Sequence, residues 1–158
     1  MDLGNRVCSL NSKPGTYAIV LHCPRECSAA IGRLGEVPLK MGYYIYVGSA
    51  FGPGGVRARV TRHQRSDKTQ HWHIDYLQAH MTVVEAWYTH DAERQEHRWA
   101  SAMKSISVAP CAKGFGSSDC DCYSHLFHAA GRPKVSEFCV AIERAVANHD
   151  RIDVWTPG

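Results

Sequence analysis

The sequence predicts an α+β fold in which a small, mainly antiparallel sheet is flanked by helices. Two observations support this prediction: strand-like and helix-like segments are mixed without a regular β-α-β alternation, and no internal repeat is visible. The 158 residues suffice for one domain with a sizeable core, and 44% hydrophobic and 21% charged residues are typical of a globular protein. We expect one domain, preceded by a flexible arm over residues 1–14 that ends before Gly15.

The first half of the chain is expected to form three strands and one helix. β-Branched, apolar and aromatic residues predict strands over residues 16–21, 30–37 and 43–49, the second of them interrupted by Gly32 and Gly35. Together the three favour an antiparallel meander. The turn FGPGG at residues 51–55 then introduces a helix, because apolar and basic residues recur at the spacing i, i+3, i+4, i+7. This spacing turns one set of residues inward, namely Val56, Arg59, Val60 and His63, and leaves Arg57, Arg62 and Arg65 on the outer faces.

The second half is expected to add helices and two more strands. The segment HWHIDYLQAH at residues 71–80 pairs aromatic and polar residues at i, i+4, which predicts a short helix. A strand is predicted over residues 81–88, a helix over residues 92–106 and an edge strand over residues 124–130. A last amphipathic helix is predicted to begin at or near Pro133, on the apolar positions Val135, Phe138, Cys139, Ile142 and Val146.

The positive charge is concentrated in one part of the chain. The formal net charge is +3, yet the stretch from Arg57 to His73 holds four arginines and one lysine against one aspartate. Such a run is either a solvated helix face or a phosphate-binding patch, and the charge alone does not separate the two.

Seven cysteines and no apolar leader favour a cytoplasmic protein whose cysteines are thiols or metal ligands. No segment approaches the roughly 20 apolar residues that span a bilayer, so no membrane partner is expected. Four of the cysteines are expected simply to pack as small buried side chains: Cys8, Cys23, Cys27 and Cys139.

The segment CDCYSH contains a possible zinc site. Cys120, Cys122 and His125 could bind zinc, joined by Cys111 or by His71 and His73, although C-x-C-x2-H is not a standard zinc-finger spacing. The alternative is a set of packed thiols and a core histidine.

Glu96 is a carboxylate on an apolar helix face. On its predicted helix it shares that face with Trp99, Ala100, Met103 and Ile106. Burying a carboxylate is costly unless something pairs with it. Glu96 is therefore either half of an ion pair with an inward arginine such as Arg59, or a metal ligand or general base that faces a pocket, with Glu93 one turn earlier.

Tyrosines occupy two of the predicted strands: Tyr17 lies on the first, and Tyr43, Tyr44 and Tyr46 lie on another. Most buried tyrosines are core rings whose hydroxyl finds a hydrogen bond. A tyrosine acts as a general base only if its pKa, ordinarily about 10, is lowered by a nearby cation. Arg59 and a metal ion held by Glu96 would meet that requirement.

These residues together resemble the GIY-YIG nuclease superfamily. Gly15-Thr16-Tyr17 stands at the first motif and Tyr46-Val47-Gly48 at the second, Arg59 and His63 match the helix motif, and Glu96 matches the metal-binding glutamate. The segments GRLGEV, WHIDYL and GFGSSDCDCYSHLF are similar to one branch of that superfamily. The resemblance covers residues 15–132 and implies a nuclease-like domain there. The helix and tail of residues 133–158 lie outside it and are expected to pack on the same domain, where the helix covers an apolar surface or mediates dimerisation.

The resemblance also implies an activity, a metal-dependent endonuclease that hydrolyses phosphodiester bonds. Glu96 would hold one Mg²⁺ or Mn²⁺, Tyr17 would accept a proton from the attacking water, and Tyr46 would orient the phosphate. Arg59 would neutralise charge on the scissile phosphate, with His63 beside it for phosphate contact or proton transfer. DNA is expected rather than RNA, in repair or structure-specific cleavage, with the backbone held by Arg57, Arg62, Arg65, Lys68, His71 and His73.

The sequence departs from the superfamily pattern in four places, the first of which is Thr16 where the motif has isoleucine. The segment from residue 23 to residue 41 implies an extra strand or loop, and the lengthened FGPGG turn leaves Arg57 as an alternative catalytic arginine. No asparagine follows Glu96 at the position many members use, where Ser118 or Asp119 falls instead. Two alternative functions therefore remain: a non-catalytic nucleic-acid-binding module of the same fold, and a zinc-binding interaction protein.

Overall fold

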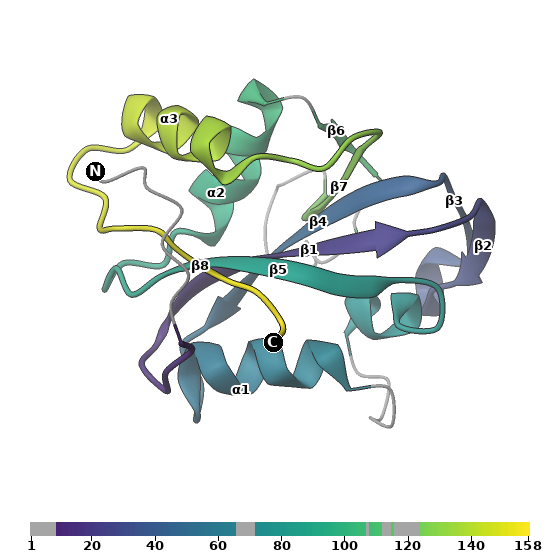
Figure 1. Ribbon diagram of the computed structural model, residues 1–158, viewed down its shortest axis with the longest axis horizontal. Coiled ribbons are helices and arrows are strands. Elements are labelled where there is room, and N and C mark those ends of the chain that lie inside the picture. Colours follow the sequence, from purple (N-terminus) through teal and green to yellow (C-terminus); the bar gives the residue numbers. More distant parts are fainter. Residues whose placement is uncertain (1–8, 66–71, 107, 112–114, 116–123) are drawn as a thin grey trace.

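A computed structural model describes residues 9–65, 72–106, 108–111, 115 and 124–158. Within these residues the protein has the predicted α+β architecture, with a six-stranded sheet in the order β6-β7-β4-β1-β5-β8 and a separate two-stranded sheet. Helix α1, Gly55–Gln64, covers one face of the large sheet, and α2, Glu96–Ala102, and α3, Val135–Ala145, cover the other (Figure 1).

Strand β1, Gly15–Cys23, is the centre of the sheet. It pairs antiparallel with β4, Gly42–Ala50, on one side and with β5, Thr82–Thr89, on the other. Because side chains alternate along a strand, Tyr17 and Ile19 belong to the core cluster on the α1 side, whereas Ala18 and Val20 belong to the cluster on the α2 and α3 side. Both faces of β1 are therefore buried.

Three short strands complete the large sheet. Strand β7, Leu126–Ala129, pairs with β4, and the two-residue strand β6, Ala109–Pro110, pairs with β7. The strand predicted at residues 124–130 is therefore confirmed, but it is not an edge strand, because β6 lies outside it. Strand β8, Asp153–Trp155, pairs with β5 and was not predicted, because three residues are too few to show an alternating pattern.

The strand predicted at residues 30–37 is two separate strands, divided where the interruption at Gly32 and Gly35 was expected. The chain forms two short strands, β2 (Cys27–Ala30) and β3 (Glu36–Leu39), joined by a 3₁₀ turn, η1 (Gly32–Leu34). Strands β2 and β3 pair antiparallel and make the small second sheet. Gly32 and Gly35 have φ of 46° and 71°, a left-handed conformation that breaks a strand. The three-stranded meander is therefore wrong, since β1 pairs directly with β4 and with β5.

The helix predicted at residues 92–106 is shorter than expected. Helix α2 begins only at Glu96, and Met103–Ser105 continue it as a 3₁₀ turn, η3. Before α2, the Asp91 carboxylate accepts hydrogen bonds from the amides of Glu93 and Asp150, which holds this segment in a turn. The helix predicted at residues 71–80 is a 3₁₀ helix, η2, His73–Leu77, and α3 starts two residues after Pro133, as predicted.

The start of α1 is bound to the segment that precedes β1. The Val56 and Arg57 amides donate to the carbonyls of Lys13 and Asn11 at 3.1 and 2.9 Å. Gly55 has φ of 58°, and a Cβ there would lie 2.2 Å from the Ser12 carbonyl oxygen, so glycine is required. The arm predicted over residues 1–14 is thus packed against α1 from residue 9 onward, and residues 1–8 lie outside the description.

Two further sequence predictions concern cysteines and membrane spans. Cys23 and Cys139 are buried and Cys27 is half-buried, as packed thiols should be, while Cys8 lies outside the described residues. Among the helices of the described chain, none is long and apolar enough to cross a bilayer.

Candidate active site

Three of the predicted site residues meet on the α1 side of the sheet. The Tyr17 hydroxyl on β1 lies 2.7 Å from Nε2 of His63 on α1, and both side chains are buried. The Tyr46 ring, on the neighbouring strand β4, meets the His63 ring edge-on at a centroid distance of 5.8 Å. The inward orientation predicted for His63 is therefore confirmed, and His63 joins both tyrosines.

Gly48 makes room for the Tyr17 phenol. Gly48 is the cross-strand partner of Tyr17, and a Cβ at this position would lie 2.4 Å from the Tyr17 hydroxyl oxygen. Only glycine lets the phenol lie flat over β4 and reach His63.

Gly48→Ala is expected to lower the free energy of unfolding by about 1–3 kcal/mol, because the phenol must move and its hydrogen bond to His63 is strained. Urea unfolding measures this change. Gly131→Ala is the matched control, because a Cβ there meets nothing within 4 Å. Equal stabilities for the two variants would contradict the packing of Tyr17 against Gly48.

Arg59 lies beside this cluster, on the same helix as His63. Its guanidinium carbon is 4.4 Å from the centre of the Trp72 ring, and the side chain is half-buried. Within the described residues no carboxylate or carbonyl pairs with this guanidinium, which leaves its N–H donors available to an anion. Arg57, the alternative arginine, donates instead from Nε and Nη2 to the Leu10 carbonyl at 3.2 and 2.8 Å. The geometry therefore favours Arg59 as the arginine of the site.

Glu96 occupies the first turn of α2 with a side chain that is 24% exposed. The preceding amide, of Gln95, donates to the Thr16 hydroxyl at 3.1 Å, and this bond attaches the start of α2 to β1 next to Tyr17. One carboxylate oxygen, Oε1, lies 2.9 Å from Nδ1 of the buried His125. The partner of Glu96 is thus a histidine, and the alternative ion pair with Arg59 does not form. The apolar face predicted for this helix is buried at Trp99, Ala100 and Met103.

Electrostatics couple these groups to one another. Burial is the largest cause that raises the pKa of Tyr17 and Tyr46 well above the usual value of a phenol. The Glu96 charge raises both pKa values further, whereas the positive charge of Arg59 lowers them. Both phenols are therefore protonated at neutral pH in the metal-free protein, and a cation bound by Glu96 would oppose the effect of its carboxylate.

The donor set at Glu96 fits a hard divalent cation. A partly exposed carboxylate is the ligand that Mg²⁺ prefers, and Mg²⁺ keeps several waters when a protein supplies one or two carboxylates. Across the described parts of the chain, no group of three or more histidine, cysteine, aspartate or glutamate side chains is arranged to hold a metal ion. An ion held by Glu96 alone would keep most of its coordination positions for water and phosphate oxygens.

The basic residues predicted to line the outer faces of α1 do not all lie there. Arg62 donates to both carboxylate oxygens of Asp75, at 2.6 and 3.0 Å, and its guanidinium covers the Trp72 ring at 4.2 Å. Arg65 is exposed at the end of α1, and His73 is half-buried with its ring 5.4 Å from that of Phe115. Lys68 and His71 lie outside the described residues.

Asp75→Asn is expected to lower the free energy of unfolding by about 3 kcal/mol, because the side chain of Asp75 is fully buried and accepts bonds from Arg62 and from the Trp72 amide. Urea unfolding is the measurement. Glu93→Gln, which breaks the exposed pair of Glu93 with Arg98, should cost less than about 1 kcal/mol. If both variants lost the same small amount, Arg62 would not be a structural residue.

The predicted zinc ligands are only partly within the description. Cys120 and Cys122 lie outside it, as do Ser118 and Asp119, whereas His125 lies next to Glu96. Cys111 is half-buried. Zinc binding by this segment stays a prediction.

Sequence reasoning missed three features of the site. Trp72 supports both Arg59 and Arg62, His125 is the partner of Glu96, and Arg94 covers the Phe51 ring at 4.6 Å. A tryptophan close to a basic helix was the one available signal for Trp72. The contact between Phe51 and Arg94 joins residues far apart in the sequence, so no sequence pattern could have predicted it.

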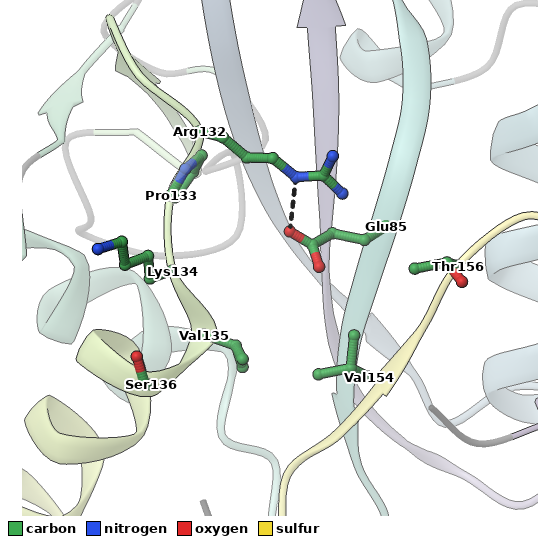
Figure 2. Close-up of a pocket in the computed structure, with 8 residues that line it drawn as sticks. All are labelled: Glu85, Arg132, Pro133, Lys134, Val135, Ser136, Val154 and Thr156. Carbon is green, nitrogen blue, oxygen red and sulfur yellow. Dashed lines mark hydrogen bonds and ion pairs between the residues drawn. The ribbon is translucent and has the colours of Figure 1, made fainter. Parts of the chain in front are cut away.

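A cavity of about 500 Å³ lies elsewhere in the fold, between β5, β8 and the start of α3 (Figure 2). Its most polar feature is the ion pair between Arg132 and the buried Glu85, at 3.4 Å. None of the predicted site residues lines this cavity, so it is separate from the cluster around Tyr17.

A protein-family model described as "Domain of unknown function DUF123" matches residues 16–148. No curated protein and no solved structure matches the chain. The family match spans every predicted catalytic residue, from Tyr17 to Glu96, and includes α3.

Proposed function

The chain belongs to the DUF123 family, and on that premise we propose that it is a metal-dependent endonuclease that hydrolyses phosphodiester bonds in DNA. The proposal also rests on the resemblance of the motifs around Tyr17, Tyr46, Arg59 and Glu96 to those of GIY-YIG nucleases. Because one fold can serve many functions, the residues of the site have to carry the argument.

One observation carries the proposal most directly. A buried phenol, Tyr17, is hydrogen-bonded to a buried histidine, His63, at 2.7 Å, with the guanidinium of Arg59 and the carboxylate of Glu96 close enough to act on the Tyr17 pKa. These four groups come from β1, α1 and α2. They combine a proton acceptor, a cation for a phosphate and a ligand for a metal ion, which are the parts that phosphodiester hydrolysis needs.

Glu96 would hold a single Mg²⁺ or Mn²⁺, which supplies a water nucleophile of lowered pKa and neutralises charge on the phosphate. Oε1 of the Glu96 carboxylate lies 2.9 Å from Nδ1 of the buried His125, so the imidazole is a direct neighbour of the proposed metal ligand.

Tyr17 would pass the proton of the attacking water onward. Because burial keeps the phenol protonated, Tyr17 can accept that proton as it gives its own to Nε2 of His63, 2.7 Å away, when His63 carries its proton on Nδ1. Tyr46 contacts the same histidine ring and would orient the phosphate. The histidine is thus the final proton acceptor within this cluster.

Arg59 would bind the scissile phosphate and stabilise the charge that develops on it. Its guanidinium lies on the Trp72 ring, which holds it in position without occupying its N–H donors. A fixed donor of this kind needs little reorganisation as charge develops. Exposed Arg65 at the end of α1 extends the positive surface for the rest of the backbone.

Nicking of supercoiled plasmid DNA tests the proposal. The protein should convert supercoiled into open-circular DNA with Mg²⁺ or Mn²⁺, and EDTA should abolish the reaction. An activity that persists in EDTA, or one that separates from the protein on a further column, would overturn the proposal. The same assay with an RNA of equal sequence distinguishes the two nucleic acids.

The second candidate is a nucleic-acid-binding module without cleavage. The raised pKa of the Tyr17 and Tyr46 phenols favours it, because neither residue is a base in the metal-free protein. This candidate expects DNA binding that weakens with added salt and no nicking with any divalent cation.

A further inference from the structure

A second stack of an arginine on an aromatic ring lies at the end of β4. The guanidinium carbon of Arg94 is 4.6 Å from the centre of the Phe51 ring, and its Nη1 donates to the Ser49 hydroxyl at 3.4 Å. Phe51 is half-buried and Arg94 is exposed. Within the described residues no carboxylate pairs with Arg94. The positive charge of Arg94 is therefore not neutralised by the fold.

This stack borders the candidate active site on two sides. Phe51 is followed by Gly52, where a Cβ would lie 3.3 Å from an Nη2 of Arg59. Arg94 precedes Glu96 by two residues. Phe51 is therefore the neighbour of a residue that touches the cation proposed to bind the scissile phosphate, and Arg94 is two residues from the carboxylate proposed to hold the metal ion.

We propose that Phe51 and Arg94 bind an unpaired nucleobase and its phosphate beside the bond that is cut, so that the preferred substrate is DNA with an unpaired nucleotide. This inference rests on the proposed function, because it assigns a substrate class to the same site. A base stacks on the ring of Phe51 in place of Arg94, and the guanidinium of Arg94 then pairs with the adjacent phosphate.

Replacement of the Arg94 guanidinium by a nucleobase on the Phe51 ring is favourable in free energy. An exposed contact of an arginine with a phenylalanine ring is weak, whereas base stacking on an aromatic side chain is stronger and tolerates every base. Trp72 is a poorer platform, since Arg59 and Arg62 both cover its ring and Arg62 is bound to the buried Asp75. In the described part of the chain the Phe51 ring is covered by one arginine, Arg94, which is not paired with a buried carboxylate.

Fluorescence anisotropy in EDTA tests the inference without any need for cleavage. Three labelled duplexes are compared: one fully paired, one with a single bulged nucleotide, and one in which that nucleotide lacks its base. The wild-type protein should bind the bulged duplex about tenfold more tightly than the paired one. Removal of the base should abolish most of that preference, because the ring of Phe51 then has nothing to stack on.

Phe51→Leu should reduce affinity for the bulged duplex about tenfold and leave affinity for the paired duplex within about twofold. Phe51→Trp should restore the preference. Arg94→Gln should weaken binding of the bulged and the base-free duplex alike, because it removes the phosphate contact. The matched control is Tyr43→Leu, which removes an aromatic ring that packs on His22 at the other end of β4.

Equal affinity of the wild-type protein for paired and bulged DNA, or equal losses for Phe51→Leu on both, would overturn the inference while plasmid nicking still supported the nuclease. A preference that depends on Phe51 in a protein that nicks no DNA would support the inference and overturn the nuclease. Failure to bind any DNA would overturn both.

Discussion

Glu96→Gln is expected to reduce DNA cleavage in Mg²⁺ by about 10³-fold, because the amide loses the charge that would hold the metal ion. The replacement has the same shape, so the contact of its side-chain oxygen with His125 and the apolar face of α2 are kept. Thermal unfolding should therefore change little, and the loss should be in rate. Single-turnover nicking of plasmid DNA is the measurement.

The matched control for this variant is Glu93→Gln. Glu93 lies three residues before Glu96, but its carboxylate is 71% exposed and pairs with Arg98 at 2.9 Å. Its activity should stay within about twofold of wild type, since an exposed ion pair contributes little. If Glu93→Gln lost activity and Glu96→Gln kept it, the metal ligand would have been assigned to the wrong residue.

Tyr17→Phe is expected to reduce the cleavage rate by about 10²- to 10⁴-fold, because the variant lacks the hydroxyl that would pass a proton to His63. Affinity for DNA should be nearly unchanged, since the ring and Arg59 remain. The same nicking assay, combined with anisotropy in EDTA, separates the two effects. Tyr44→Phe is the control, because it removes a buried hydroxyl that donates to the Lys40 carbonyl, away from the site.

The Tyr17 prediction has a pH dependence with a definite sign. Burial raises the pKa of Tyr17 in the folded protein above its value in the unfolded chain. Ionisation of the phenol at high pH therefore favours the unfolded chain. The contribution of Tyr17 to stability is fully present below about pH 10 and is lost as pH rises toward the folded pKa. Tyr17→Phe should therefore lose less stability than wild type between pH 10 and about pH 11. An equal loss would indicate that the phenol is not buried.

Much of the fold could be predicted from the sequence, because its central elements have regular patterns. Strands β1, β4 and β5 are rich in β-branched, apolar and aromatic residues, and helices α1 and α3 carry apolar residues at helical spacing. The errors arose where local chemistry overrides a pattern. Positive φ at Gly32 and Gly35 replaces one strand by two, and the hydrogen bonds of Asp91 delay the start of α2.

The candidate site was predictable in its members and less so in its contacts. Tyr17, Arg59, His63 and Glu96 were chosen as candidates from residue type, from spacing and from the resemblance of their motifs to those of GIY-YIG nucleases. Their partners depend on which segments meet in space. Arg62 and Asp75 are 13 residues apart, and Arg94 and Ser49 are 45 residues apart. Helical spacing placed Arg62 on an outer face, and only the position of η2 shows that Asp75 binds it there.

The position of the metal ion tests the central claim most directly. Anomalous diffraction from crystals grown with Mn²⁺ and a phosphorothioate DNA should reveal one manganese ion. We predict that the ion is bound by Glu96, on the side of the carboxylate that faces the Tyr17 hydroxyl and Arg59, and that it is missing in Glu96→Gln. Manganese bound by other side chains, with Glu96 still paired only to His125, would contradict the account.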